Sequence, residues 1–223
     1  MSPRNRIRTR HRGDDCGSQP LFYGRLGRTP LAMREVQLHW PDGEITHAVP
    51  REPLAIFPGS FDPLHDGHRK LAAVVGRKFG REIHFELSRT NVDKPELPIE
   101  ILKARTEQFR GYAPLWVTRA AIFEEKSALF PGALFVVGFD TALRLLDAKY
   151  YRDEAARETS LRTIAERGCR FVVGGRVDAA GIFQIWRTHG ALFEVLTEED
   201  FRLDIRSTEL RVNTPARVVA RPR

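Results

Sequence analysis

Residues 54–68 constrain the fold of this chain more than any other stretch. Residues 54–57 are four consecutive apolar residues, which predicts a short buried strand. Pro58 and Gly59 end that run. From about Asp66 onward, apolar residues recur at three- and four-residue spacing, which predicts an amphipathic helix. The stretch therefore predicts a strand, a glycine-containing turn and a helix N-terminus in close succession.

The residues at this turn suit an anion. A helix N-terminus presents unpaired N–H groups and a partial positive charge, and Gly59 and Gly67 would let the backbone approach a ligand closely. His65 and His68 lie three residues apart, so both rings can face one ligand, donate hydrogen bonds to a polyphosphate and carry positive charge as its charge grows. We interpret the stretch as a cradle for a nucleoside triphosphate. The alternatives are a pair of metal ligands and ordinary surface histidines.

The remainder of the chain alternates between strand and helix patterns. Strands are expected at 83–87, 115–118, 133–137 and 170–173, helices at about 99–110, 120–130, 140–148 and 153–167, and further strand character at 182–187 and 191–196. Such alternation predicts an α/β fold with a Rossmann-like, doubly wound parallel sheet and right-handed crossovers. Ligands of such sheets bind at the carboxyl ends of the strands, which is where residues 58–68 fall.

The chain is expected to divide into four regions. Alternating apolar residues in 34–49, around Pro41-Asp42-Gly43, predict a β-hairpin that either covers a sheet edge or forms an interface. We expect a disordered basic tail at 1–20, an extension carrying the hairpin at 21–52, the main domain at 53–213 and a second basic tail at 214–223.

The net charge of +7 comes from the two ends of the chain. Residues 1–12 contain five arginines and residues 217–223 contain three, with no acidic residue in either segment. These eight charges exceed the total by one, so residues 13–216 carry a formal charge of −1. We therefore expect no specific nucleic-acid partner.

Composition also bears on the compartment. No run of about 18 apolar residues predicts a membrane span, and no apolar segment follows the charged N-terminus as in a secretory signal. The two cysteines make neither a disulfide framework nor a zinc pattern. A cytoplasmic protein without a membrane partner is expected.

Two motifs carry a resemblance to a known family. The run Gly59-Ser60-Phe61-Asp62-Pro63-x-His65-x-Gly67-His68 resembles the signature of the nucleotidylyltransferase superfamily. Residues 205–211, Ile-Arg-Ser-Thr-Glu-Leu-Arg, resemble its second signature, I-S-S-T-x-I-R, with Arg206 at the first serine and Leu210 at the second isoleucine.

The resemblance implies roles for the residues of both motifs. His65 and His68 would hold the triphosphate and stabilise the transition state. The other implied phosphate contacts are Gly59, Ser60, the Phe61 backbone, Ser207, Thr208 and, as a clamp on the β- and γ-phosphates, Arg211. Taken alone, Ser207 and Thr208 would be a plain helix N-cap.

Three further sites follow from the same resemblance. Lys94 lies where family members place a basic residue against the acceptor or the α-phosphate, although it could be an ordinary loop lysine. Gly138 and Asp140 resemble a G-x-D element that approaches the nucleotide's sugar or base, and Asp140 could also cap the next helix. Tyr151, in the pair Tyr150-Tyr151, could stack on a pyridine ring or be a packing residue.

The resemblance implies an enzyme that joins an acceptor phosphate to the α-phosphate of a nucleoside triphosphate and releases pyrophosphate. The acceptor phosphate is mostly ionised at neutral pH, because its second pKa is about 6, and so needs no general base. Mg²⁺ is expected to arrive with ATP and to be held through the phosphates, without a protein metal site.

Within this superfamily, the chain most resembles the nicotinate or nicotinamide mononucleotide adenylyltransferases of NAD biosynthesis. The features that carry this resemblance are the separation of about 140 residues between the motifs, Gly138-x-Asp140 and the tyrosine pair. ATP and a pyridine mononucleotide are then the expected small-molecule substrates, and a homo-oligomer is left open. The alternatives are a cytidylyl- or adenylyltransferase for another phosphorylated acceptor and a non-catalytic nucleotide-binding or RNA-associated protein.

Overall fold

The computed structural model describes residues 36–47, 53–90, 95–177, 183–184 and 190–201. Their helices are α1 (Asp66–Phe79), α2 (Ile99–Glu107), α3 (Phe123–Leu129), α4 (Phe139–Leu146), α5 (Glu154–Glu166) and the short 3₁₀ helices η2 (Ala148–Tyr150) and η3 (Gly190–Leu192). Their strands are β1 (Gln37–His39), β2 (Ile45–Thr46), β3 (Ala55–Pro58), β4 (Ile83–Ser88), β5 (Leu115–Thr118), β6 (Leu134–Gly138), β7 (Arg170–Gly174), β8 (Arg176–Val177), β9 (Phe183–Gln184) and β10 (Phe193–Val195).

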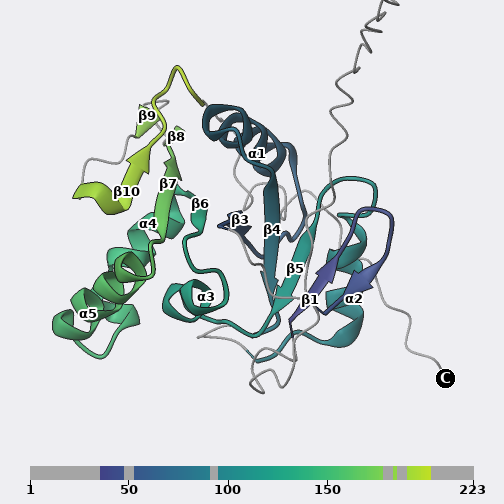
Figure 1. The fold of residues 1–223 in the computed structure, drawn as a ribbon, viewed down its shortest axis with the longest axis horizontal. Coiled ribbons are helices and arrows are strands. Elements are labelled where there is room, and N and C mark those ends of the chain that lie inside the picture. The colour runs from purple at the N-terminus through teal and green to yellow at the C-terminus, as the bar shows by residue number, and fades with distance from the viewer. Residues whose placement is uncertain (1–35, 48–52, 91–94, 178–182, 185–189, 202–223) are drawn as a thin grey trace, which may run out of the picture.

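Eight of these strands form one sheet, in the order β10-β7-β6-β3-β4-β5-β1-β2 (Figure 1). The strands from β10 to β5 are parallel to one another. The chain adds β4 and β5 on one side of β3 and then β6, β7 and β10 on the other. This confirms the predicted doubly wound α/β fold and puts its switch point between β3 and β6.

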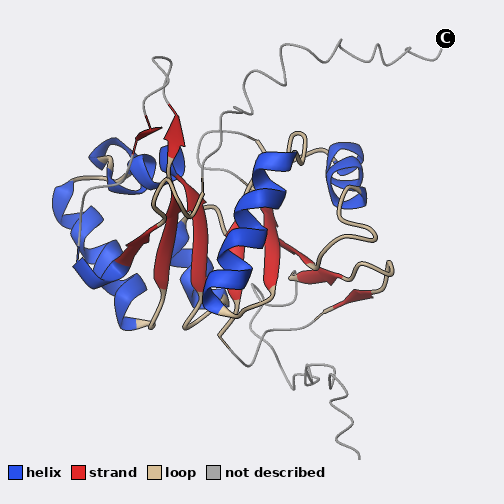
Figure 2. Cartoon of the chain, turned by 90° about the horizontal axis from the view of Figure 1, so that it is seen from above, coloured by secondary structure: helices blue, strands red, loops and turns tan. Residues whose placement is uncertain are grey.

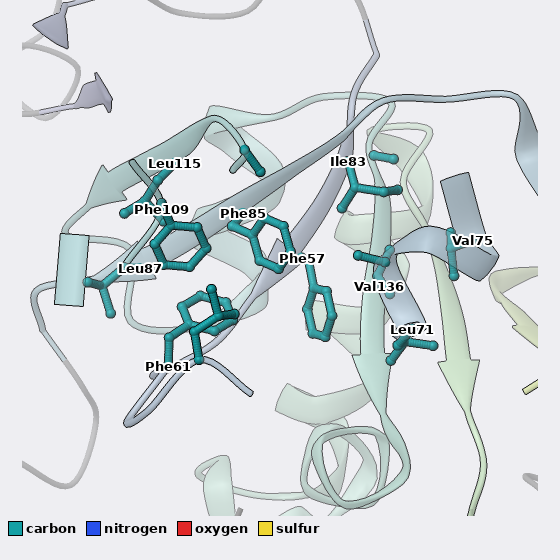
Figure 3. Packing of buried hydrophobic residues seen from close by; sticks show 14 of the residues in the cluster. Phe57, Phe61, Leu71, Val75, Ile83, Phe85, Leu87, Phe109, Leu115 and Val136 are labelled. Atoms are coloured by element: carbon teal, nitrogen blue, oxygen red, sulfur yellow. The ribbon is translucent and has the colours of Figure 1, made fainter. Parts of the chain in front are cut away.

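Alternate residues of the strands face two separate hydrophobic cores. In β6, Leu134 and Val136 join the core that contains α1 and α2, whereas Phe135 and Val137 join the core that contains α4 and α5. Figure 2 shows helices on both faces of the strands, and Figure 3 shows the first core, in which α1 packs on the sheet through Leu71 and Val75. The purely apolar sequence of β6 follows from its burial on both faces.

The predicted hairpin extends the sheet at one edge. β1 pairs antiparallel with both β2 and β5, and Leu38 lies opposite Trp116. Gly43 occupies the turn with a φ of 96°, a conformation that favours glycine. Of the two roles considered for the hairpin, the structure shows the first: it covers the edge of β5.

Two local expectations have different outcomes. Strand character is expected at 182–187, and its described residues 183–184 do form a strand, β9, which pairs with β8 in a separate two-stranded sheet. Asp140 does not cap α4, because the N-cap residue is Gly138 and Asp140 lies within the first turn. Its carboxylate there still faces the positive end of the helix dipole.

Candidate active site

The loop between β3 and α1 is folded around Phe61. This residue has a φ of 46°, and its side chain is 1% exposed. Its ring lies over Gly59, where a Cβ atom would come within 2.6 Å of the ring. The N–H of Gly59 donates to the carbonyl of Glu86 in β4 over 2.9 Å. Glycine at 59 is therefore required by the packing of Phe61, while the phosphate contacts expected of both residues stay predictions.

The Phe61 ring connects the loop to the core and to the second histidine. It meets Phe57, Phe85 and Phe109 edge-on, with ring centroids 5.0–6.1 Å apart. It also meets the ring of His68 edge-on at 5.2 Å. Three of these aromatic residues are labelled in Figure 3 beside Phe61. The position of His68 is thus set by a rigid aromatic cluster rather than by a surface rotamer.

Two side chains from α2 and the turn after it hold the loop from the outside. The Gln108 amide bridges the loop: its Nε2 donates to the Phe61 carbonyl over 3.0 Å, and its Oε1 accepts from the Leu64 N–H over 2.8 Å. The Arg105 guanidinium donates to the Ser60 carbonyl over 3.1 Å and to the Asp62 carboxylate over 2.8 Å. These contacts fix the backbone that leads into His65.

His65 and His68 form one stacked unit at the start of α1. Their ring centroids are 3.7 Å apart and their planes differ by 26°. His65 is the N-cap residue, and its Nδ1 accepts from the Gly67 N–H over 3.1 Å. His68 Nδ1 accepts in turn from the His65 N–H over 3.3 Å. The two rings therefore lie side by side, and their contact with a common ligand stays a prediction.

These hydrogen bonds decide which ring nitrogen carries the proton. A backbone N–H can only donate, so Nδ1 of each ring must present its lone pair. In the neutral form, the proton of each ring is then on Nε2, and each ring can donate one hydrogen bond from that atom. The unit can therefore offer two N–H donors to an anionic ligand without carrying charge itself.

Burial keeps both rings neutral. It lowers the pKa of His68 from 6.5 to about 3, with the neighbouring His65 as the second cause. Burial also lowers the pKa of His65, against a smaller opposing effect of Asp66. The positive charge expected of these rings is thus absent at neutral pH in the protein as described. A bound polyphosphate would favour the charged form and raise both pKa values.

The helix N-terminus is less open than the sequence indicated. The N–H of Gly67 bonds to the His65 ring, and the N–H of His68 bonds to the His65 carbonyl over 2.9 Å. Two of the first N–H groups of α1 are therefore satisfied within the chain. The predicted phosphate contacts of His65 and His68 would then be made through the imidazole Nε2–H groups.

The other candidates that the structure describes are Ser60, Gly138, Asp140 and Tyr151. Ser60 is exposed on the loop. Gly138 ends β6, and among the described residues a Cβ atom there would meet nothing within 4 Å. Asp140 is exposed. Tyr151 is half-buried, and its hydroxyl donates to the Leu145 carbonyl over 2.9 Å, which ties it to α4. That contact supports a packing role for Tyr151 beside the predicted stacking role.

Four predicted site residues lie outside the described residues. They are Lys94, Ser207, Thr208 and Arg211. The convergence of the second motif on the stacked histidines therefore stays a prediction.

A buried ion pair next to the loop was not foreseen. Lys126 Nζ donates to both oxygens of Glu86, over 2.9 and 2.8 Å, and to the Ala120 carbonyl over 2.7 Å. Thr118 Oγ1 donates to the same carboxylate over 2.6 Å. Both charged side chains are nearly inaccessible. The sequence held one signal, a glutamate at an inward position of an otherwise buried strand.

The described part of the chain holds no group of three His, Cys, Asp or Glu side chains that could bind a metal ion. No described helix is long and apolar enough to span a membrane. Two open hollows, one beside α5 and one beside the start of β4, contain neither His65 nor His68 in their linings.

Comparison with known proteins assigns the family. A family model described as cytidylyltransferase-like matches residues 56–213. The chain belongs to this cytidylyltransferase-like family. The match begins at the second residue of β3 and includes the loop, the stacked histidines and every later strand up to β10. It also extends over the second motif.

Two curated proteins are similar to this chain. The putative nicotinamide mononucleotide adenylyltransferase of Schizosaccharomyces pombe is 28% identical over 123 residues, which are 49% of each chain. The probable nicotinate-nucleotide adenylyltransferase of Roseobacter denitrificans is 28% identical over 160 residues, 65% of this chain and 79% of the relative. The chain thus spans about half of the first relative's length.

Proposed function

We propose that this protein transfers AMP from ATP to the phosphate of nicotinate or nicotinamide mononucleotide, with release of pyrophosphate and formation of a dinucleotide for NAD biosynthesis. The observation that carries the proposal is the stacked pair His65–His68, which offers two Nε2–H donors at the carboxyl end of β3. The names of the two relatives support the choice of acceptor.

The reaction needs little from the protein beyond position and charge stabilisation. An oxygen of the acceptor phosphate attacks the α-phosphorus of ATP, and the bond to the bridging oxygen of pyrophosphate breaks. Negative charge grows on the non-bridging α-oxygens and on the leaving group. Donors fixed in advance stabilise such charge without reorganisation, and the two imidazoles are fixed by the backbone and by Phe61.

The remaining roles belong to the same proposal. Lys94 would contact the acceptor or the α-phosphate, and Ser207, Thr208 and Arg211 would hold the β- and γ-phosphates. Mg²⁺ would be bound mainly by phosphate oxygens, as is usual for nucleotide substrates. We place the reaction in the cytoplasm, because both cysteines are expected to stay reduced.

A second candidate is cytidylyl transfer to another phosphorylated acceptor. It is favoured by the description of the matching family as cytidylyltransferase-like. The loop and the histidine pair serve either nucleotide, because they would contact phosphates rather than the base.

A pyrophosphate-release screen separates the candidates. ATP and CTP are each combined with nicotinate mononucleotide, nicotinamide mononucleotide, glycerol 3-phosphate and phosphopantetheine. Release with ATP and a pyridine mononucleotide supports the first proposal, and release with CTP alone supports the second. The control is the His65→Asn/His68→Asn double variant, which should be inactive, beside His47→Asn, an exposed histidine outside the site, which should be fully active. No release with any pair would remove both candidates.

A further inference from the structure

The hollow beside the start of β4 has an apolar floor and a rim of arginines. It is a groove of about 600 Å³ between α1 and the segment that leads into β5. Its floor includes Ala72 of α1 and Ile83 and Phe85 of β4, which are buried apolar residues. Ile83 begins β4 and Pro114 directly precedes β5, so the groove reaches the amino ends of these strands. The loop that carries the histidine pair follows the carboxyl end of β3, at the opposite end of the sheet.

The charged residues of the lining are mostly arginines. Arg69 and Arg77 lie on α1, Arg81 follows the helix, and Glu82 is the acidic residue of the described lining. Three positive charges and one negative charge give this lining a formal charge of +2. The groove therefore favours a ligand with negative charge.

The charges of the rim are available to a ligand. Arg77 and Arg81 are exposed, and neither forms an ion pair within the part of the chain that the structure describes. Arg69 lies over the ring of Tyr112, 4.0 Å from its centroid, and this contact engages no carboxylate. The single carboxylate of the described lining belongs to Glu82, whose Oε2 lies 3.8 Å from the Nε2 of the buried His84.

The spacing of the arginines suits an extended anion. Arg69 and Arg77 are eight residues apart on one helix, which is about 12 Å at 1.5 Å per residue. Arg81 lies beyond the C-cap residue Gly80 and lengthens the row. A single phosphate group cannot reach both ends of this row. The same length corresponds to about two turns of a partner helix or about four residues of an extended strand.

The groove suits a protein segment better than a nucleic acid. Single-stranded nucleic acids bind through bases that stack on aromatic rings. Here the ring of Tyr112 is covered by Arg69, and Phe85 is 1% exposed, so neither offers a stacking surface. The apolar floor can instead receive the aliphatic side chains of a peptide.

The choice of cation also indicates a protein partner. The guanidinium of arginine pairs with a carboxylate through two parallel hydrogen bonds, and arginine is enriched at protein interfaces whereas lysine is depleted. Neither Lys70 nor Lys78, the lysines of α1, lines the groove. Lys78 is instead bound to Asp200, with Nζ 2.9 Å from its carboxylate.

We propose that this groove docks an acidic segment of a partner protein, with carboxylates on the three arginines and apolar side chains on the floor between α1 and β4. The inference does not depend on the proposed transferase reaction, because the lining contains neither histidine of the pair.

Fluorescence anisotropy with three labelled probes tests the class of the partner. The first probe is a peptide of about 12 residues that alternates pairs of glutamate and leucine, long enough to span the arginine row. The second is an all-glutamate peptide of the same length, and the third is an oligouridylate of about 12 nucleotides. The glutamate–leucine peptide should bind most tightly, and added salt should weaken its binding because the arginines are exposed.

Charge reversal locates the binding site on the full chain. Arg77→Glu/Arg81→Glu should weaken binding of the glutamate–leucine peptide at least about tenfold, because repulsion replaces two ion pairs. The matched control is Arg144→Glu, an exposed arginine in the last turn of α4 as Arg77 is in the last turn of α1, and it should leave the affinity unchanged. The arginine-rich ends of the chain are the same in all three proteins, so the difference between them reports the groove. Equal Tm values for the two variants show that the fold is intact.

Four results would overturn the inference. They are no binding of the glutamate–leucine peptide at millimolar concentration, equal affinity in both variants, and equal binding of the all-glutamate peptide, which would mean that the floor takes no part. The fourth is tighter binding of the oligouridylate that Arg77→Glu/Arg81→Glu abolishes, which would make the groove a nucleic-acid surface.

Discussion

His68 is held and kept neutral by the same contacts. The edges and faces of Phe57 and Phe61 surround its ring, and the His65 N–H bonds to its Nδ1. Burial by these neighbours lowers the pKa to about 3. At neutral pH this donor stays uncharged until a polyanion raises its pKa, so its interaction with the ligand is strongest as negative charge develops.

Removal of this donor should slow turnover more than it weakens ATP binding. For His68→Ala or His68→Asn we expect kcat to fall about 10²- to 10³-fold, as for loss of one fixed transition-state donor. The KM for ATP should change much less. Steady-state pyrophosphate release measures both, with His47→Asn as the control. Unchanged turnover would remove the proposed role of His68.

The low pKa of His68 also predicts how stability depends on pH. The unfolded chain binds a proton at this side chain below its ordinary value of 6.5, whereas the folded chain does so only near 3. Between these values the unfolded state holds more protons, so the group's contribution to the free energy of unfolding decreases as pH falls, by at most about 1.4 kcal/mol per pH unit.

Urea unfolding of the protein and of His68→Gln at pH 4, 5, 6 and 7 isolates this effect. Carboxylates with lowered pKa values, such as Asp200 and Asp153, change stability in the same direction but are common to both proteins. The stability difference between the two proteins should therefore shift toward the variant as pH decreases. A difference that is independent of pH would contradict the assigned pKa.

At the scale of elements, the loop between β3 and α1 depends on the segment that ends α2. Gln108 uses both ends of its amide on the loop, and Arg105 adds the Ser60 carbonyl and the Asp62 carboxylate. These partners are 43 to 47 residues apart in the chain. Gln108 is a positioning residue, since it acts on a ligand only through the loop.

Gln108→Ala should lower stability by about 1–3 kcal/mol, because the Phe61 carbonyl and the Leu64 N–H both lose their partner. The kcat should fall while the KM for ATP changes little, because the histidine pair loses its exact support. Gln108→Glu keeps the acceptor for the Leu64 N–H but loses the donor to Phe61, so its loss should be intermediate. Equal activity in all three proteins would show that the amide has no positioning role.

The Glu86–Lys126 pair ties β4 to α3 beneath the same sheet edge. Glu86→Gln would leave the Lys126 charge buried without a counter-charge, which should cost about 3–5 kcal/mol in the free energy of unfolding. The double change Glu86→Leu/Lys126→Met should be milder than the single one, because it removes both charges. Urea denaturation measures these values, and a double variant less stable than Glu86→Gln would contradict the explanation.

The elements were largely predictable from local pattern. The strand at 115–118 and the start of the helix at Asp66 agree with the structure, because their apolar periodicity and the preceding turn residues are unambiguous. The histidine pair was predictable because three-residue spacing on a helix brings side chains together. The contacts of Gln108 and Lys126 were not predictable, because nothing local records which distant strand or loop a polar side chain will meet.

At the scale of the whole molecule, the excess positive charge lies outside the part of the sequence that forms the eight-stranded sheet. Residues 13–216 carry a formal charge of −1, and the arginine-rich segments lie at the two ends. Deletion of residues 1–20 should therefore leave kcat and the KM for ATP unchanged, since no proposed site residue is removed. A filter-binding assay compares RNA binding by the full chain and by the deletion variant. If the deletion left no RNA binding and the full chain had no transferase activity, the protein would instead be the RNA-associated alternative.

The central claim is that the stacked histidines meet the triphosphate, with the second motif on its other side. A crystal structure with a non-hydrolysable ATP analogue tests it most directly, through the distances from the phosphate oxygens to His65 Nε2, His68 Nε2, Thr208 Oγ1 and the Arg211 guanidinium. We predict hydrogen-bond distances of about 2.7–3.2 Å for both imidazoles and for at least one group of the second motif. A triphosphate bound away from both rings, or one that touches them while residues 207–211 lie elsewhere, would contradict the account.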